Sequence, residues 1–286
     1  MEQAGDLDVR MYVYPSIGKT GDFTRAKELM DEYRDGYVIM PGLKAYGDGV
    51  IDAHTGVLNA PYLDKPEDPD FNATPIFTQE ALSDIITKAN AEGYPVRIHC
   101  TGDGSTRMAL NAFEASIKAN GRHGLRNGIE HIELMEDEDY PRFAELDVMA
   151  NKQPAHYYLC TEKYMLDALG ERRWFRSQPL KSFYDAGANV SLSTDFPIVE
   201  INPFHNIYVA VTRLDLEGNE IGADINEKID IFQALQGYTY MGAYGMGAEN
   251  EIGSLEAGKL ADIAVINGRV FDEDPEKLLD RKSVLT

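Results

Sequence analysis

Apolar and polar positions along the chain follow two alternating periods. The stretch 94–100, "YPVRIHC", puts Val96 and Ile98 on one face of a short strand, and residues 105–121 then carry apolar side chains at helical spacing. The same order of a short strand followed by an amphipathic helix recurs along most of the chain. This pattern predicts parallel βα units.

Six such units can be delimited in the sequence. Their strands are predicted within residues 8–15, 37–49, 94–100, 125–134, 147–156 and 188–197. The helices that follow are predicted over 22–36, 78–93 with Thr78 as N-cap, 105–121, 137–146, 179–187 and 202–214. One more helix over 230–247 and a β-hairpin-like tail over 253–271 come last. A closed eight-stranded barrel needs two more units, so the pattern falls short of one.

Charge and composition narrow the class of protein. The chain has 27 Lys and Arg against 48 Asp and Glu, a net charge of -21, which argues against a nucleic-acid partner. No apolar run approaches the ~20 residues that span a bilayer, and residues 1–10 lack the features of a signal peptide. Cys100 and Cys160 are the only cysteines, which favours a reducing compartment. We therefore predict a cytoplasmic protein without a membrane partner.

Four ionisable residues recur at one topological place, at or near the C-terminal end of a predicted parallel strand: Lys44, His99, His131 and Asp195. Those strand ends form the mouth of the active site in α/β barrels and the ligand site in open sheets. Neutral imidazole and carboxylate groups suit zinc and similar divalent ions. A lysine that loses its proton there can accept CO₂ and form a bridging carbamate.

Each of these residues alone has an ordinary structural explanation. A histidine at a strand end can bond a loop carbonyl, a lysine can extend to solvent, and Asp195 can cap a turn. The ordered set of four favours a metal site instead. Glu130 is expected on the opposite face of its strand from His131.

Further polar residues near the same mouth have two readings each. Gln153 and His156 follow a predicted strand and are assigned to substrate binding, with a loop position as the alternative. Asp48 either shapes the turn between two glycines or acts near Lys44. Asp103 is expected to cap the helix that starts near residue 105.

Several segments resemble the amidohydrolase superfamily, in the branch of the YtcJ-like proteins and N-substituted formamide deformylase, some relatives of which carry an exoenzyme-regulator label. They include "LKAYGDG", "HCTGDGSTRMALNAFE", "GIEHIEL", "LKSFYDAGANVSLSTDFP" and "GSLEAGKLADIAVI", and they follow the order of the family. The resemblance implies a metal-dependent (β/α)₈ TIM-barrel hydrolase with a small β-sandwich built from both chain ends.

Carried over by position, the resemblance makes His99 and His131 ligands on the fifth and sixth strands of that barrel. Asp195 becomes the carboxylate of the eighth strand, and Lys44 the fourth-strand lysine, which is open to carboxylation. It also implies one or two divalent metal ions, zinc above all. Asp195 would take the proton of an activated water and pass it to the leaving nitrogen.

One departure from the family concerns its first strand, which carries a His-x-His pair. All six histidines of this chain are isolated, and the predicted strand 8–15 corresponds to the third strand of the family. We therefore expect a truncated form with an incomplete or rearranged barrel over residues 1–248 and a remnant of the small β domain over 249–286. Exposed sheet edges would favour a homo-oligomer.

Two functions from different classes follow. The first is a hydrolase of carbon–nitrogen bonds other than peptide bonds, acting on a small amide-type molecule and weakly active or inactive in this form. The alternative is a non-catalytic regulatory or binding protein on the same scaffold.

Overall fold

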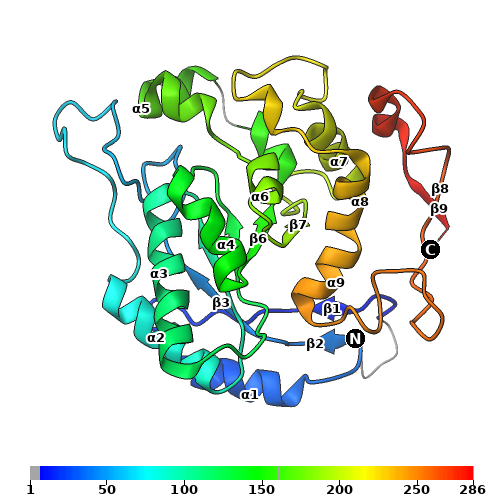
Figure 1. The fold of residues 1–286 in the computed structure, drawn as a ribbon, viewed down its shortest axis with the longest axis horizontal. Helices are drawn as coiled ribbons and strands as arrows, with labels where there is room; N and C mark the ends of the chain where they lie inside the picture. Colours follow the sequence, from blue (N-terminus) through cyan, green and yellow to red (C-terminus); the bar gives the residue numbers. More distant parts are fainter. Residues whose placement is uncertain (1–6, 160–161, 286) are drawn as a thin grey trace.

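A parallel sheet of five strands lies at the centre of the computed structural model, which describes residues 7–159 and 162–285. Cys160, used to predict a reducing compartment, and residues 1–6, part of the segment that lacks signal-peptide features, lie outside the described residues. The strands lie side by side in chain order: β3 (Leu43–Tyr46), β4 (Val96–Cys100), β5 (Gly128–His131), β6 (Met149–Lys152) and β7 (Val190–Leu192) (Figure 1). The predicted parallel sheet is thus confirmed.

The predicted strand within residues 8–15 is shorter in the structure, and the one within 37–49 is divided in two. Only Met11–Tyr12 (β1) is regular in the first range, and it pairs in parallel with Val38–Ile39 (β2) as a separate ladder, while β3 forms the second part of 37–49. Beyond Pro15, the chain still follows the edge of β3 through a parallel bridge between Ser16 and Lys44. Pro15 and Pro41 interrupt both segments, because proline lacks the N–H that a ladder needs.

The two faces of the sheet carry different side chains, because successive residues of a strand point to opposite sides. One face is apolar and includes Leu43, Val96 and Ile98, all fully buried. Helices α2 (Gln79–Ala91), α3 (Asp103–Asn120) and α4 (Tyr140–Leu146) cover it (Figure 1). Thr78 caps α2 as predicted, its hydroxyl accepting from the Ala81 N–H at 3.2 Å. The other face carries polar residues and faces the site.

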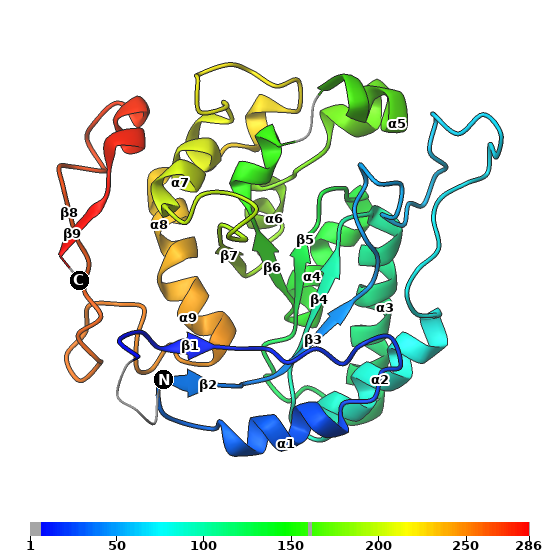
Figure 2. The same cartoon turned by 180° about the vertical axis from the view of Figure 1, so that it is seen from behind.

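Helices of the last third border the polar face. They are α7 (Pro203–Thr212), α8 (Ile231–Tyr238) and α9 (Tyr240–Met246), and α8 and α9 pack against β7. Figures 1 and 2 show α9 across the sheet from α2 and α3, where the Gly245 carbonyl accepts from the Arg97 guanidinium. The prediction of one helix over 230–247 is wrong, because Thr239 has φ -115° and ψ -88° and separates two helices.

Two other features differ from the sequence pattern. Helix α5 (Glu162–Phe175) was not predicted, and Gly170 inside it has a φ of +75° that divides it into two short arms. The predicted hairpin over 253–271 is wrong, because β8 (Val265–Ile266) pairs antiparallel with β9 (Ser283–Leu285) instead (Figure 2). The remaining short helices are α1 (Thr24–Glu32), η2 (Asp137–Asp139), η3 (Pro154–Tyr158), α6 (Lys181–Asp185), η4 (Ile225–Glu227) and η5 (Pro275–Asp280).

Among the described residues, the helices are too short or too polar for any of them to span a bilayer.

Candidate metal centre

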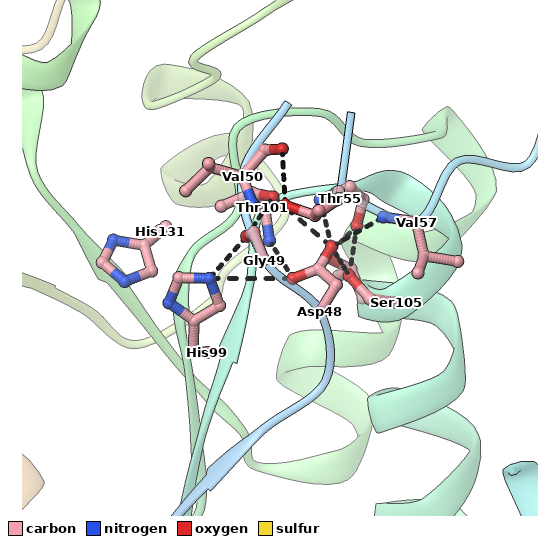
Figure 3. Close-up of polar contacts among 12 residues, drawn as sticks. Asp48, Gly49, Val50, Thr55, Val57, His99, Thr101, Ser105 and His131 are labelled. Atoms are coloured by element: carbon pink, nitrogen blue, oxygen red, sulfur yellow. Dashed lines mark hydrogen bonds and ion pairs between the residues drawn. The ribbon is translucent and has the colours of Figure 1, made fainter. Parts of the chain in front are cut away.

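His99 occupies the polar face near the end of β4, with one ring nitrogen already in use. Its Nε2 lies 2.7 Å from the carbonyl oxygen of Gly49 (Figure 3). A carbonyl only accepts, so Nε2 carries the proton and Nδ1 keeps the free lone pair. A backbone carbonyl on the other ring nitrogen is a common way to fix the tautomer of a metal-ligating histidine.

Asp48 holds the chain that surrounds His99. Its carboxylate is buried, and Oδ1 lies 3.8 Å from His99 Nε2 (Figure 3). Burial raises the pKa of this carboxyl, while the hydrogen bonds it accepts oppose that shift. The donors are the N–H groups of Val57 (2.9 Å), Thr101 (3.0 Å) and Gly102 (3.0 Å) and the hydroxyls of Ser105 (2.6 Å) and Thr101 (3.4 Å).

The turn after β4 comes very close to the loop that precedes α2. A Cβ atom on Gly102 would lie 2.0 Å from the Val57 carbonyl oxygen, so a side chain is excluded at this position. Asp103 is the first residue of α3 rather than its cap, and it accepts from the N–H of Asn59 at 3.0 Å in the same loop. The predicted capping role of Asp103 is therefore replaced by a tie between loop and helix.

His131 reaches the same face as His99 through an unusual backbone. His131 and Ile132 have φ values of +74° and +54°, and this left-handed turn ends the alternation of β5. The His99 and His131 rings consequently meet, 4.5 Å apart between centroids. The Lys152 ammonium donates to both carbonyls, at 2.7 Å for Ile132, and so stabilises the turn.

Glu130 also lies on the His99 face, since the two residues are register partners in neighbouring parallel strands. It accepts from the Asn151 side-chain amide at 2.9 Å. The expectation that Glu130 and His131 face opposite sides is wrong, because alternation fails at the positive φ of His131.

Gln153 orients the ring of His131 rather than standing free in the cavity. Its Oε1 lies 3.0 Å from His131 Nδ1, and its amide nitrogen donates to the Ser193 hydroxyl at 2.9 Å. The proton of neutral His131 therefore lies on Nδ1, and Nε2 keeps its lone pair. Burial, with nearby imidazole and lysine charges, lowers the pKa of His131 to about 2, so the ring is neutral near pH 7.

His156 faces His131 from η3, with the two rings stacked at 5.6 Å and 11°. Its Nε2 is 3.5 Å from Asp195 Oδ2. Burial lowers the pKa of His156 to about 4, so this imidazole is also neutral near pH 7. Asp195 follows β7 with a φ of +55°, and burial raises the pKa of its carboxyl, against the lowering effect of the charge of Lys44.

These side chains line one cavity of 260 Å³ at the C-terminal ends of the strands. Ligand-type atoms of His131, His156 and Asp195 all lie within 4.8 Å of one another, and His99 lines the same cavity. This set of imidazoles and a carboxylate fits a divalent ion of the zinc type. The full lining is Val50, Asp52, His99, His131, Glu133, His156, Leu159, Asp195 and Ile198.

Of two further residues of the site, Lys44 was predicted from the sequence and Glu133 was not. Lys44 belongs to the same face and holds its ammonium 5.3 Å from the centre of the Tyr46 ring. Glu133 was missed, and it lies in the cavity wall with its pKa raised to about 7 by burial. The neighbouring residues do not indicate that Glu133 lies in the cavity wall, because its position depends on the left-handed turn that begins two residues earlier.

The chain belongs to the amidohydrolase family, whose model matches residues 1–286. YtcJ of Bacillus subtilis (strain 168) is 28% identical to it over 287 residues, which cover 96% of this chain and 53% of YtcJ. N-substituted formamide deformylase of Arthrobacter pascens is 28% identical over 200 residues, 70% of this chain and 35% of that protein. The resemblance read from the motifs is thereby confirmed.

A solved structure supports the same assignment. An uncharacterized metal-dependent hydrolase from Pyrococcus furiosus matches with a TM-score of 0.76 and 27% identity, over 96% of this chain and 53% of that one. The chain thus spans about half, or less, of the length of these relatives.

Proposed function

We propose that the chain carries the catalytic face of a metal-dependent hydrolase that cleaves carbon–nitrogen bonds other than peptide bonds. The observation that carries this proposal is the convergence of His99, His131 and Asp195 in one cavity at the ends of parallel strands. Membership of the amidohydrolase family supports the reaction class. The name of the Arthrobacter pascens relative supports a small amide-type substrate such as an N-substituted formamide.

The cofactor in this proposal is a divalent ion, with zinc as the first candidate. His99 Nδ1 and His131 Nε2 have their lone pairs free because Gly49 and Gln153 hold the opposite ring nitrogens. Such an ion would polarise a substrate carbonyl and would make a water molecule more acidic. Lys44 lies on the same face, where a carbamate formed on its side chain would add oxygen ligands.

Asp195 has the proton-transfer role in this scheme. Its carboxylate is partly open to the cavity, and the burial that raises its pKa makes it a better base than an exposed aspartate. It would take a proton from the attacking water and return it to the departing nitrogen. Val50, Leu159 and Ile198 supply apolar surface around a substituent on that nitrogen.

The architecture proposed for this function is an open part of a (β/α)₈ barrel. We assign residues 1–248 to it and residues 249–286 to a remnant of a small β domain, where β8 and β9 pair. The five strands β3–β7, in chain order with helices on one face, support the barrel assignment.

A hydrolysis assay with metal control tests the proposal. The purified chain, stripped with a chelator and then loaded with Zn²⁺, should release formate from N-substituted formamides, and the stripped form should not. Asp195→Asn should abolish the release even at Zn²⁺ concentrations that refill the site, because the carboxylate is the proposed base as well as a proposed ligand. Asp70→Asn, at an exposed aspartate of the loop before α2, is the matched control. No turnover by the loaded chain on formamides or cyclic amides would refute the assignment.

A further inference from the structure

We propose that His156 is itself a ligand in this centre, so that the ion is held by His131, His156 and Asp195 as well as by His99. The inference rests on the proposed function, because it names a further ligand of the same metal. It also replaces the substrate-binding role that the sequence pattern gave to His156.

The first argument is an unsatisfied nitrogen. His156 is only 7% exposed, and its Nε2 is buried with no hydrogen-bond partner among the described residues. Leaving a buried polar atom without a partner costs about 1–3 kcal/mol, and such atoms in folded proteins call for an explanation. The atom points into a cavity whose other walls carry imidazole and carboxylate groups. A bound cation would provide the missing partner.

The second argument is distance. Zinc bonds of about 2.0–2.1 Å in tetrahedral geometry put two ligand atoms about 3.4 Å apart. His156 Nε2 and Asp195 Oδ2 are 3.5 Å apart, which is the separation of two ligands on one ion. The whole set with His131 lies within 4.8 Å, so shifts of about 1 Å would complete the geometry.

The third argument is that the backbone holds His156 in place without using its imidazole. The His156 N–H donates to the Gln153 carbonyl at 3.0 Å, and the Ala155 N–H donates to the side chain of Asn206 at 2.8 Å. Gln153 therefore connects two imidazoles, since its side chain orients His131 and its carbonyl anchors His156. Preorganised ligands of this kind lose little freedom when a metal binds.

The rival reading is that His156 contacts substrate and leaves the metal to the other residues. A ligand and a substrate contact differ in one measurable respect, which is metal affinity without substrate. We therefore propose competition titrations of the chelator-stripped full chain with Zn²⁺ alone. His156→Asn should lower the affinity at least about 100-fold, beyond the 10–100-fold typical of an outer-shell partner. His123→Asn, at an exposed histidine, is the matched control and should not change it.

A cysteine variant identifies the ligand directly and keeps the test valid if His156→Asn fails to fold. His156→Cys places a thiolate at the same position, and Co²⁺ bound to it should show a thiolate-to-metal charge-transfer band in the near ultraviolet. His123→Cys should show none, which also controls for Cys100 and Cys160. Circular dichroism of the metal-free variants verifies that they are folded.

The outcomes separate this inference from the proposed function. Zn²⁺ affinity retained in His156→Asn but lost in His131→Asn, with no charge-transfer band in His156→Cys, overturns the inference and leaves the hydrolase proposal standing. A wild-type chain that takes up no Zn²⁺ or Co²⁺ overturns it as well. Loss of affinity in His156→Asn with no amide hydrolysis by the loaded wild type supports the ligand and refutes the hydrolase.

Discussion

Replacing Asp48 by alanine should destabilise the fold and loosen His99 together. The carboxylate accepts from three backbone N–H groups and two hydroxyls, which come from the loop before α2, the turn after β4 and the first turn of α3. Alanine removes every acceptor at once. The Gly49 carbonyl, next to Asp48 in the chain, then loses its fixed position opposite His99 Nε2.

The expected loss in the free energy of unfolding follows from these contacts. A hydrogen bond to a charged group contributes about 1.5–3 kcal/mol, and water that enters the space left by the carboxylate restores part of this. We expect Asp48→Ala to lower the free energy of unfolding by about 4 kcal/mol, in the upper range for one substitution. With an unfolding entropy of about 2.1 cal/mol/K per residue over 286 residues, the Tm falls by about 7 °C. Asp48→Asn keeps one acceptor oxygen and should lose about half as much.

Urea and thermal unfolding of the metal-free variants measure both quantities. Asp70→Ala, at an exposed position of the same loop, is the control and should stay within about 0.5 kcal/mol of the wild type. Zn²⁺ titration of the same samples reports on His99. A loss below about 1 kcal/mol for Asp48→Ala, or equal losses for the alanine and asparagine variants, would refute the reasoning.

Three further predictions concern other parts of the molecule. Arg213 is 1% exposed, lies 3.9 Å from the centre of the Tyr157 ring and donates to two backbone carbonyls. Arg213→Met should therefore lower the free energy of unfolding in urea by about 3 kcal/mol. A loss under about 1 kcal/mol would contradict this. Because the pKa of His156 is lowered in the folded chain, the unfolded chain binds more protons below pH 6.5. The free energy of unfolding of the metal-free protein should therefore fall between pH 7 and 5 by about 2 kcal/mol more in the wild type than in His156→Asn. The same dependence of unfolding free energy on pH in both proteins would contradict this prediction. Thr78→Ala should lower the free energy of unfolding by about 1 kcal/mol, and Thr78→Ser should leave it almost unchanged because the hydroxyl cap is kept. A larger loss for serine than for alanine in thermal unfolding would contradict this prediction.

The sequence carried most of the information about the sheet and its polar ends. Apolar alternation in strands such as 94–100 predicts which side chains lie under the helices, and the same alternation puts His99 on the opposite face. These are local properties of a few successive residues. For that reason the parallel strands and the place of His99 could be predicted without a structure.

What could not be predicted depends on contacts between distant segments. The left-handed turn at His131 and Ile132 is stabilised by Lys152, twenty residues away on the next strand. The donors to the Asp48 carboxylate are also distant in the sequence, and Ser105 is 57 residues away. No pattern within a short window contains such pairs, so the joint position of the two histidines and the role of Asp48 were out of reach.

Two further differences between the predicted and observed elements have other causes. β8 has its partner in β9 rather than in the adjacent residues, so local hairpin signals were misleading. In α5, the positive φ of Gly170 breaks the apolar periodicity by which helices are recognised.

The close approach of Gly102 to Val57 has a consequence for how this cavity can diversify. The turn after β4 and the loop before α2, which together hold His99, are joined by backbone groups and by the buried Asp48 carboxylate. No side chain fits at Gly102 in this turn. Val50, Leu159 and Ile198 at the opening are 39%, 43% and 58% exposed. Under the proposed function, exchanging these three residues in a directed-evolution library should change substrate preference while the proposed metal ligands keep their positions.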